Sequence, residues 1–393
     1  MTVYLRYFLM PLILIASTVG FLWGGGWMWT GFVLSLVLVV GGDAVAGDDL
    51  EAPAYRHEWL LDLSLYSVLP LLLTMLAVLA WMCGASGDAL GLGALVQSWL
   101  GWDMQAARAA TGAADLVGAV LSAGLVGATA ATNVGHELTH RKRDPLARGV
   151  ARWLLAFSCD ASFSIEHVYG HHATLGTARD PATARRGENA WVFVLRSVVG
   201  QSRSAWQLEK ERLAKKGISV WSWRSRMPRG IAMSAAYFLG FYLLGGWTGV
   251  LVFLGTTIWA RSLLEFVNYL EHYGLVRVPH TAVKPHHSWN SNKRVSAFML
   301  YNLTRHSHHH AQSYQPFWNL RPFPQAPTLD YGYLTSIILS MFPPLWHRLM
   351  IPKLKQWDER YATPEERALA AAQNAASGLP ALMQGAAAGA SRA

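Results

Sequence analysis

Long apolar runs alternate with polar stretches over the first two thirds of the chain. Six of these runs approach or reach the roughly 17–25 residues that a helix needs to cross a lipid bilayer. The sequences GGGW after the first run and GGWTG between the last two predict tight reversals of the chain. The pattern predicts an all-α integral membrane protein, a six-helix transmembrane bundle whose spans cover residues 7–23, 27–44, 66–84, 114–132, 231–246 and 249–269.

The segments outside these runs predict a helical cap on the bundle. Gly149–Ser158 and Trp191–Gly200 are short apolar stretches interrupted by arginine, which is typical of helices that lie in the membrane interface. From residue 376 the chain is rich in alanine and glycine, which predicts a flexible tail over 376–393. We therefore expect one membrane-bound domain over residues 1–375.

The distribution of charge orients the bundle. Charged residues make up 15% of the chain, well below the roughly 25% of a soluble domain. Residues 133–229 nevertheless contain 17 Lys and Arg against 8 Asp and Glu, so the positive-inside rule predicts that they lie in the cytoplasm. With six spans, residues 270–360 lie on the same side. We expect a multi-pass protein of a bacterial-type inner (cytoplasmic) membrane. Because the positive charge lies at a membrane face, it does not indicate nucleic-acid binding.

The candidate chemistry lies in the histidines. The chain has 15 histidines and 2 cysteines, so a metal site would be built from imidazole and carboxylate rather than thiolate. Most of the histidines fall in four short stretches, GHELTH, EHVYGHH, NYLEHYG and RHSHHHA. Each stretch lies just past the predicted cytoplasmic end of a span or in a cytoplasmic loop. Four clusters on one side of a bundle favour metal coordination over coincidence.

The spacing of the histidines in the first two clusters indicates which side chains share a helix face. His136 and His140 are four residues apart, so both imidazoles leave one face of a helix and point to one ion. His167 and His171 repeat this spacing. His172 turns about 100° aside and is free to reach a second ion.

The last two clusters bring further ligands to the same place. His306 lies three and four residues before His309 and His310, again a converging set. The sixth span ends in the stretch that carries His272. Nine imidazoles with few carboxylates suit two borderline ions such as iron, copper or zinc, and spacing alone does not distinguish these metals.

Two other functions fit parts of the pattern. His136 to His140 matches the His-Glu-x-x-His signature of zinc proteases, but a zinc protease needs three protein ligands and this chain offers nine. A histidine-lined metal transporter would need ionisable residues along several spans. The first five spans contain almost none, which argues against a transporter.

The four clusters, in this order, resemble those of the integral-membrane alkane 1-monooxygenases and the related xylene monooxygenases, from about Leu5 to Ala375. HELTH, EHVYGHH and RHSHHHA resemble the three histidine boxes that these enzymes share with membrane desaturases and fatty-acid hydroxylases. NYLEHYGL (Asn268–Leu275) is more specific, because desaturases lack it. Lys353–Ala370 resembles the xylene-type members in particular. A lipid desaturase or fatty-acid hydroxylase is the alternative within enzymes.

The resemblance implies an O2-dependent monooxygenase that is surrounded by membrane lipid. It would convert the terminal methyl group of a hydrophobic substrate, an n-alkane or an alkyl-aromatic such as xylene, to a primary alcohol. It implies two non-haem iron ions and electrons from a rubredoxin or a [2Fe–2S] reductase. His308 falls at a variable position and is not among the expected ligands. Carried over residue by residue, the iron ligands are His136, His140, His167, His171, His172, His272, His306, His309 and His310.

Several acidic residues are candidates for supporting the metal ligands. Arg261 and Glu265 lie four residues apart within the sixth span, where they can neutralise each other. Glu265 lies about two turns before the histidine of the fourth cluster and could orient it. Glu137, Glu166 and Glu271 each adjoin a predicted ligand but point to other helix faces, so we expect them to accept imidazole N–H bonds rather than bind iron.

Overall fold

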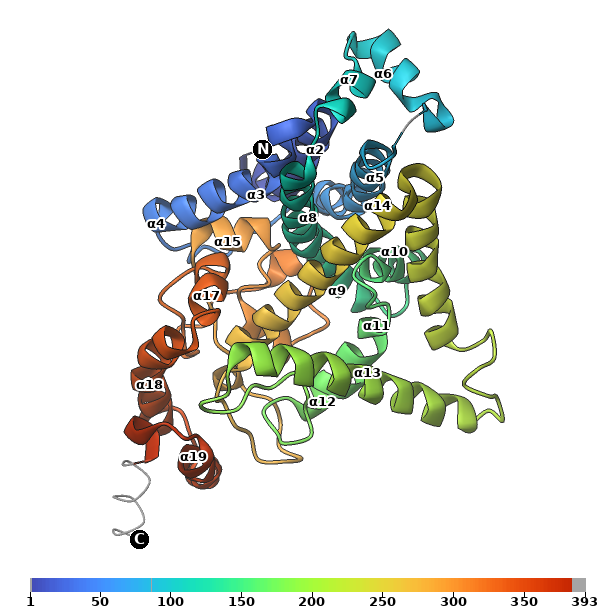
Figure 1. The fold of residues 1–393 in the computed structure, drawn as a ribbon. Coiled ribbons are helices and arrows are strands. Elements are labelled where there is room, and N and C mark those ends of the chain that lie inside the picture. The colour runs from blue at the N-terminus through green and yellow to red at the C-terminus, as the bar shows by residue number, and fades with distance from the viewer. Residues whose placement is uncertain (1, 86, 384–393) are drawn as a thin grey trace.

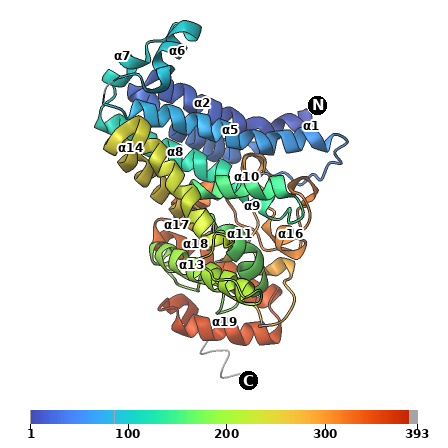
Figure 2. The ribbon, with the colours of Figure 1, turned by 90° about the vertical axis from the view of Figure 1, so that its right-hand side faces the viewer.

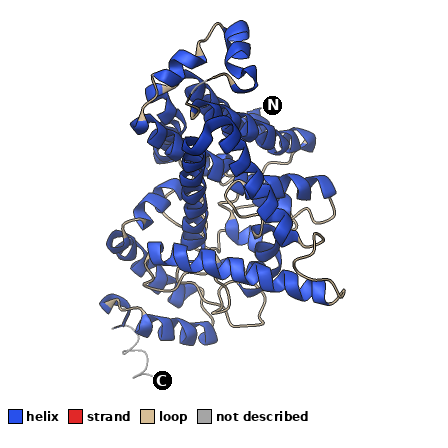
Figure 3. Ribbon diagram, turned by 45° about the vertical axis from the view of Figure 1, so that its right-hand side comes forward, coloured by secondary structure: helices blue, strands red, loops and turns tan. Residues whose placement is uncertain are grey.

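The computed structural model describes residues 2–85 and 87–383, and this part of the chain is helical, with only isolated β-bridges (Figure 3). Five helical runs are long and apolar enough to cross a membrane, which agrees with the predicted all-α membrane protein. These runs form the upper part of the molecule in Figure 1, and the predicted cap lies below them. The runs are Val3–Trp23, Gly25–Ala46, Glu58–Met82, Ala113–Thr139 and Arg226–His272.

The last of these runs, α14 (Arg226–His272), contains both the fifth and the sixth predicted span. It is interrupted at Gly246, whose φ of 59° and ψ of −152° are not helical. The rings of Phe241 and Phe253 lie with their centroids 4.5 Å apart, which a straight helix of that length would not allow. The chain therefore reverses at Gly246, as the GGWTG sequence predicts (Figure 1).

Two helices are longer than their apolar runs suggest. The helix α5 (Glu58–Met82) begins eight residues before the predicted start of the third span. The fourth span continues past residue 132, because α8 (Ala113–Gly127), a π-helical stretch (Ala128–Thr132) and α9 (Asn133–Thr139) form one helical run. The second extension carries His136 into the cap.

The remaining helices divide between the bundle and the cap. Figure 2 shows α2, α5 and α8 side by side, with α6 and α7 at the far end from α19. The bundle and its far end contain α1 (Thr2–Leu5), α2 (Leu9–Trp23), α3 (Thr30–Ser35), α4 (Gly42–Ala46), α6 (Leu92–Leu100) and α7 (Met104–Ala109). The cap contains α10 (Pro145–Ala156), α11 (Phe163–Glu166), α12 (His172–Thr174), α13 (Ala190–Ala214), α15 (Arg294–Met299), α16 (His306–Ala311), α17 (Tyr333–Ser340), α18 (Pro343–Arg360) and α19 (Pro364–Ala376).

The C-terminal helices are fastened to the cap by a buried arginine. The Arg186 side chain donates to Asp358 of α18, to Asn374 of α19 and to the backbone oxygen of Gly274. The packing continues past α19, since Leu382 is buried in the same apolar cluster. Most other residues from 376 to 383 are exposed, and residues 384–393 of the predicted flexible tail lie outside the described residues.

Glycines allow the helices of the bundle to approach closely. A Cβ atom added at Gly127 would overlap the ring of Phe157, and one added at Gly124 would overlap Trp259. Membrane helices associate through such small residues, because the bilayer provides no hydrophobic force between them.

Replacing Gly127 with alanine is expected to destabilise the folded protein by about 1–3 kcal/mol, because the Phe157 ring must move out of a packed position. Unfolding by denaturant in detergent micelles would measure the change. Gly240→Ala is the matched control, since no atom lies within 4 Å of its added Cβ. Equal destabilisation by both substitutions would contradict close packing at Gly127.

Candidate metal centre

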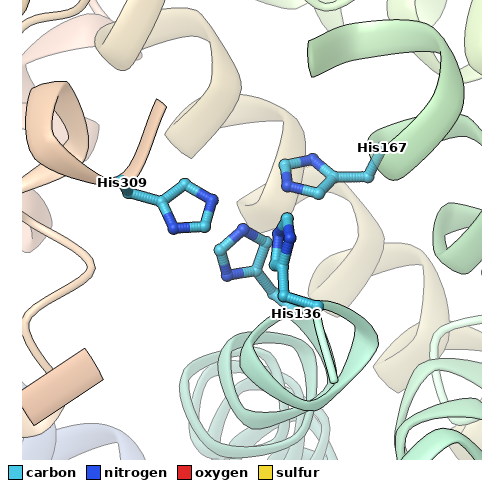
Figure 4. A group of neighbouring side chains, drawn as sticks. His136, His167 and His309 are labelled. Carbon is cyan, nitrogen blue, oxygen red and sulfur yellow. The ribbon is translucent and has the colours of Figure 1, made fainter. Parts of the chain in front are cut away.

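The four histidine clusters meet in the interior of the cap, directly below the bundle. His136 comes from α9, His172 from α12, His272 from the last residue of α14 and His309 from α16. Figure 4 shows the imidazole rings of His136, His167 and His309 turned toward one another from three different elements. All nine predicted ligands lie in this one cluster of rings, whose neighbouring centroids are 4.4–6.4 Å apart.

The ring nitrogens form two groups of four. In each group, one nitrogen from every residue lies within 4.8 Å of the others. His172 lies between the two groups, because its Nε2 is 3.0 Å from Nε2 of His167 and its ring is 4.4 Å from that of His310. The first group is His136, His140, His167 and His309, and the second is His171, His272, His306 and His310.

This division corrects the expected role of the second cluster. The stretch from His167 to His171 is π-helical, with more residues per turn than an α-helix. Residues five apart then share a face, so His167 pairs with His172, while His171 points to the other group. We expected His167 and His171 to point to one ion, as four-residue spacing in an α-helix predicts, but their nitrogens fall in different groups of four.

The third histidine box is divided in the same way. His309 belongs to the first group, whereas His306 and His310 belong to the second, with their Nε2 atoms 2.8 Å apart. In the first histidine box, HELTH, His136 and His140 both lie in the first group, as their four-residue spacing predicts. The two groups therefore draw on different combinations of the four clusters.

The cluster has the protonation state and the unmet bonding that a metal centre requires. Burial lowers the pKa of His140 to about 3 and that of His309 well below its usual value, so these imidazoles are neutral and keep a free lone pair at pH 7. Both ring nitrogens of His136 and the Nε2 atoms of His140, His171 and His309 are buried without a hydrogen-bond partner. Such orphaned nitrogens are costly unless they bind an ion. The donor set therefore fits two metal ions bound by imidazole.

His308 belongs to neither group, although in the sequence it lies between two of their members, His306 and His309. Its Nδ1 accepts a hydrogen bond of 2.7 Å from the backbone N–H of Arg321, and its ring packs against Phe323 at 4.6 Å. These contacts agree with its exclusion from the expected ligand set.

The shortest carboxylate contact to the cluster comes from a residue that the sequence did not suggest. Oδ2 of Asp180 lies 2.9 Å from Nδ1 of His171, and both groups are buried. Burial opposes charge on both, yet their attraction holds the pKa of Asp180 below and the pKa of His171 above the usual values. Thr183 and the backbone N–H of Ala182 also donate to Asp180. Asp180 thus orients His171 with its Nε2 directed into the cluster.

Asp180 could not be found from spacing, because it lies in a loop nine residues after His171. Two other histidines, His286 and His287, lie outside the cluster and face Glu366 of α19. The bond from His287 Nε2 to Glu366 is 2.7 Å long, while its Nδ1 accepts the backbone N–H of Lys284. This tautomer leaves no lone pair on Nε2 of His287 for a metal, so the bond from His287 to Glu366 ties α19 to the segment before Ser288.

The four predicted supporting glutamates differ in what they touch. Glu271 contacts the cluster, with one oxygen 3.1 Å from Nε2 of His306 and the other accepting the Tyr333 hydroxyl at 2.9 Å. The carboxylate of Glu137 accepts the backbone N–H of Phe317. Glu166 is buried with both oxygens unpaired, and burial together with Asp180 raises its pKa.

Glu265 takes part in a buried polar network in the bundle rather than in a contact with the described cluster. It lies 3.1 Å from Arg261, as the four-residue spacing predicts. It also accepts hydrogen bonds from Gln201 at 2.8 and 2.9 Å and from Asn268 at 3.1 Å, and Arg261 pairs further with Asp160. Arg261 thus pairs with both carboxylates, and the neutral amides of Gln201 and Asn268 donate further hydrogen bonds to Glu265.

An apolar cavity leads from the bundle to the histidines. Val39, Leu125 and Leu263 line it within the membrane-spanning helices. His136, His167 and His306 also line it, so residues of both groups border the same apolar space.

Comparison with known proteins agrees with this site. The family model for fatty acid desaturases matches residues 111–335. The chain is 33% identical to the xylene/toluene monooxygenase hydroxylase component XylM of Pseudomonas putida over 96% of both chains. It is 39% identical to alkane 1-monooxygenase 2 of Pseudomonas aeruginosa over 68% of this chain and 71% of that protein. Alkane 1-monooxygenase of Ectopseudomonas oleovorans is 34% identical over 80% of this chain and 75% of its own length.

The likeness to XylM extends from the bundle through the C-terminal cap, and the likeness to the alkane 1-monooxygenases also covers well over half of the chain. The part of this chain that the desaturase model matches contains all four histidine clusters. The chain therefore belongs to the family of integral-membrane, histidine-rich hydrocarbon monooxygenases that includes the alkane 1-monooxygenases and the xylene monooxygenase hydroxylase component.

Proposed function

We propose that this protein is a membrane monooxygenase that uses O2 to convert the terminal methyl group of a hydrocarbon to a primary alcohol. The observation that carries the proposal is the apolar cavity that ends on His136, His167 and His306, at the edge of nine clustered imidazoles. Its relatives are named as alkane and xylene monooxygenases. The reaction consumes one methyl group, O2, two electrons and two protons and yields the alcohol and water.

Two iron ions are the proposed cofactors, held by the nine histidines, with Asp180 and Glu271 supporting His171 and His306. When bound, iron supplies the activation of O2 that insertion into a strong C–H bond requires. The buried position of the imidazoles keeps bulk water from this chemistry. The support from Asp180 and Glu271 keeps the ligands oriented while the substrate enters and leaves.

The chain's own contribution to the reaction is to position the substrate. The leucine, valine and methionine side chains of the cavity would hold the hydrocarbon by apolar contact alone, with its methyl end toward the histidines. Asn133 and Thr132 lie beside His136 in the cavity wall, each with a buried polar atom that has no partner. They would form hydrogen bonds with the hydroxyl group of the alcohol product. The hydrocarbon substrate has no polar group and cannot form these bonds.

Filling the cavity is expected to change which substrates are used. Ala128→Phe adds a ring to the cavity wall at the level of the bundle, so turnover of hexadecane should fall about tenfold or more relative to octane. Product analysis in competition between the two alkanes would measure the ratio. Val117→Phe is the matched control, because Val117 is 55% exposed on the outside of α8. An unchanged ratio in Ala128→Phe would contradict substrate binding in this cavity.

We further propose six membrane spans, with α14 contributing two of them on either side of Gly246, and a cap that faces the cytoplasm of a bacterial-type cell. The reversal at Gly246 and the basic composition of residues 133–229 support this arrangement. A reporter fused after residue 246 should be active outside the cytoplasm, and one fused after residue 360 should be active inside.

Electrons are proposed to come from a rubredoxin or a [2Fe–2S] reductase that docks on the cap. The exposed basic residues Arg143, Arg185 and Lys215 would attract an acidic donor. If so, the rate of electron transfer should fall as ionic strength rises. A rate independent of salt would remove this proposal.

The substrate is proposed to be an n-alkane or an alkyl-aromatic hydrocarbon. Likeness to XylM along nearly the whole chain favours the aromatic substrate, whereas the alkane 1-monooxygenases share slightly higher identity over a shorter part. Cells that produce the protein with a reductase should be fed octane, hexadecane, xylene and p-cymene, and the alcohols read by mass spectrometry. Formation of an alkene or a modified lipid instead would favour a desaturase or fatty-acid hydroxylase.

A further inference from the structure

A second cavity, unlike the first, is strongly basic. It lies between α10, the helical segment that carries His167 and the first residues of α14. None of the described residues that line it is acidic. Its cationic lining residues, called here the basic pocket, are Lys142, Arg148, Arg152, Arg226 and Arg229.

The positive charge of the basic pocket is only partly compensated. Glu209 binds Arg226 at 2.7 and 2.9 Å, but the same carboxylate also binds Arg212. The Nη2 atom of Arg152 donates to the backbone oxygen of Arg226, while its Nε is buried without a partner. Burial, together with the nearby Arg229 and Arg226, lowers the pKa of Arg152 to about 10. An anion in the pocket would relieve this repulsion.

The basic pocket lies at the depth where the polar surface of the protein becomes apolar. Arg229 is followed two residues later by Ile231, which is 59% exposed, and exposed apolar residues continue up the outer face of α14. Trp221 and Trp223, just before α14, are 72% and 69% exposed, as tryptophans at a membrane interface often are. Charged residues in front of an apolar helix surface mark the level of the lipid headgroups.

We propose that the basic pocket binds the phosphate group of an anionic phospholipid from the adjoining leaflet. The pocket supplies several cationic donors around one concave space, which suits a phosphate. The exposed apolar surface above Arg229 provides contact for the acyl chains. A soluble phosphate would not use that surface, and a protein partner would have to reach it through the headgroups.

Lipid in this pocket would also support the metal centre. Thr139 and Val168 line the pocket, and each adjoins a histidine of the first group, His140 and His167. An anionic lipid bound there would hold the two helical segments together on the side away from the substrate cavity. The site is thus distinct from both the metal centre and the hydrocarbon cavity.

The test measures phosphatidylglycerol bound to the full-length protein by native mass spectrometry, after release from nanodiscs of phosphatidylcholine that contain phosphatidylglycerol. Arg148→Gln/Arg152→Gln is expected to weaken retention of phosphatidylglycerol about 30-fold, at about one kcal/mol for each charge removed. Lys215→Gln/Lys216→Gln removes the same charge from an exposed position outside the pocket and should leave retention unchanged. Bound iron and the midpoint of thermal unfolding report whether each variant folds.

Because Arg152 is partly buried, Lys142→Gln/Arg148→Gln serves as a second pocket variant, since both side chains are exposed. It should also lose phosphatidylglycerol, and so a folding defect in the first variant does not decide the outcome. Equal retention in the pocket variants and the Lys215 control would overturn the proposal. So would binding of inorganic phosphate without any preference for phosphatidylglycerol, or a slower electron transfer from the donor protein with lipid retention unchanged.

Discussion

Replacing His309 with asparagine is expected to abolish turnover, whereas the same replacement at its neighbour His308 should leave turnover and iron content mostly intact. His309 has a buried, unpartnered Nε2 and belongs to the first group of four. His308 instead accepts the backbone N–H of Arg321 through Nδ1, and an asparagine oxygen can take over that bond. The two residues share a helix and burial, so the comparison isolates metal coordination.

Both variants should be purified in detergent, and their iron content and product formation measured side by side. A loss of turnover beyond about 100-fold in His309→Asn is expected, because removing a ligand costs more than removing a residue that supports one. Comparable activity in the two variants would show that the third histidine box is assigned wrongly.

Replacing Asp180 with asparagine is also expected to have a large effect, on the binding of iron. In Asp180→Asn the carboxylate that holds Nδ1 of His171 is replaced by a neutral amide, so the imidazole loses its fixed tautomer and orientation. We expect iron affinity at the second group to fall about 10–100-fold. Competition with a chelator would measure the affinity, and the Mössbauer spectrum of the remaining iron should change.

Asp330→Asn is the matched control, since Asp330 is exposed and pairs only with Lys353 among the described residues. A purely structural role for Asp180 would lower thermal stability without altering the spectrum of the bound iron. In that case Asp180 would not be a positioning residue for His171.

The bundle and the set of nine histidines could be predicted from the sequence, because each depends on a simple pattern. Apolar runs of spanning length identify membrane helices whatever their packing, and the reversal at Gly246 follows from a glycine-rich stretch. Histidines repeated at short intervals past the ends of spans can only meet in one place. The ion pair between Arg261 and Glu265 followed from helical spacing in the same way.

The division of the histidines could not be predicted, because it depends on helix type and on loops. Sequence spacing was interpreted with the period of an α-helix, but His167–His171 is π-helical, which brings His172 beside His167. A nitrogen of His171 lies with the other group. Asp180 approaches His171 through a loop whose path no periodicity records. The basic pocket likewise combines Arg152 and Arg229 from helices far apart in the chain.

Iron held by the buried histidine cluster would supply the chemistry that places one atom of O2 in a hydrocarbon from the membrane. The most direct test is to supply oxygen-18 gas to the purified, iron-loaded protein with a reductant and an electron-transfer partner, and to analyse the alcohol by mass spectrometry. We expect a primary alcohol that carries one labelled oxygen atom. An alcohol whose oxygen comes from water, or an alkene in place of an alcohol, would contradict it.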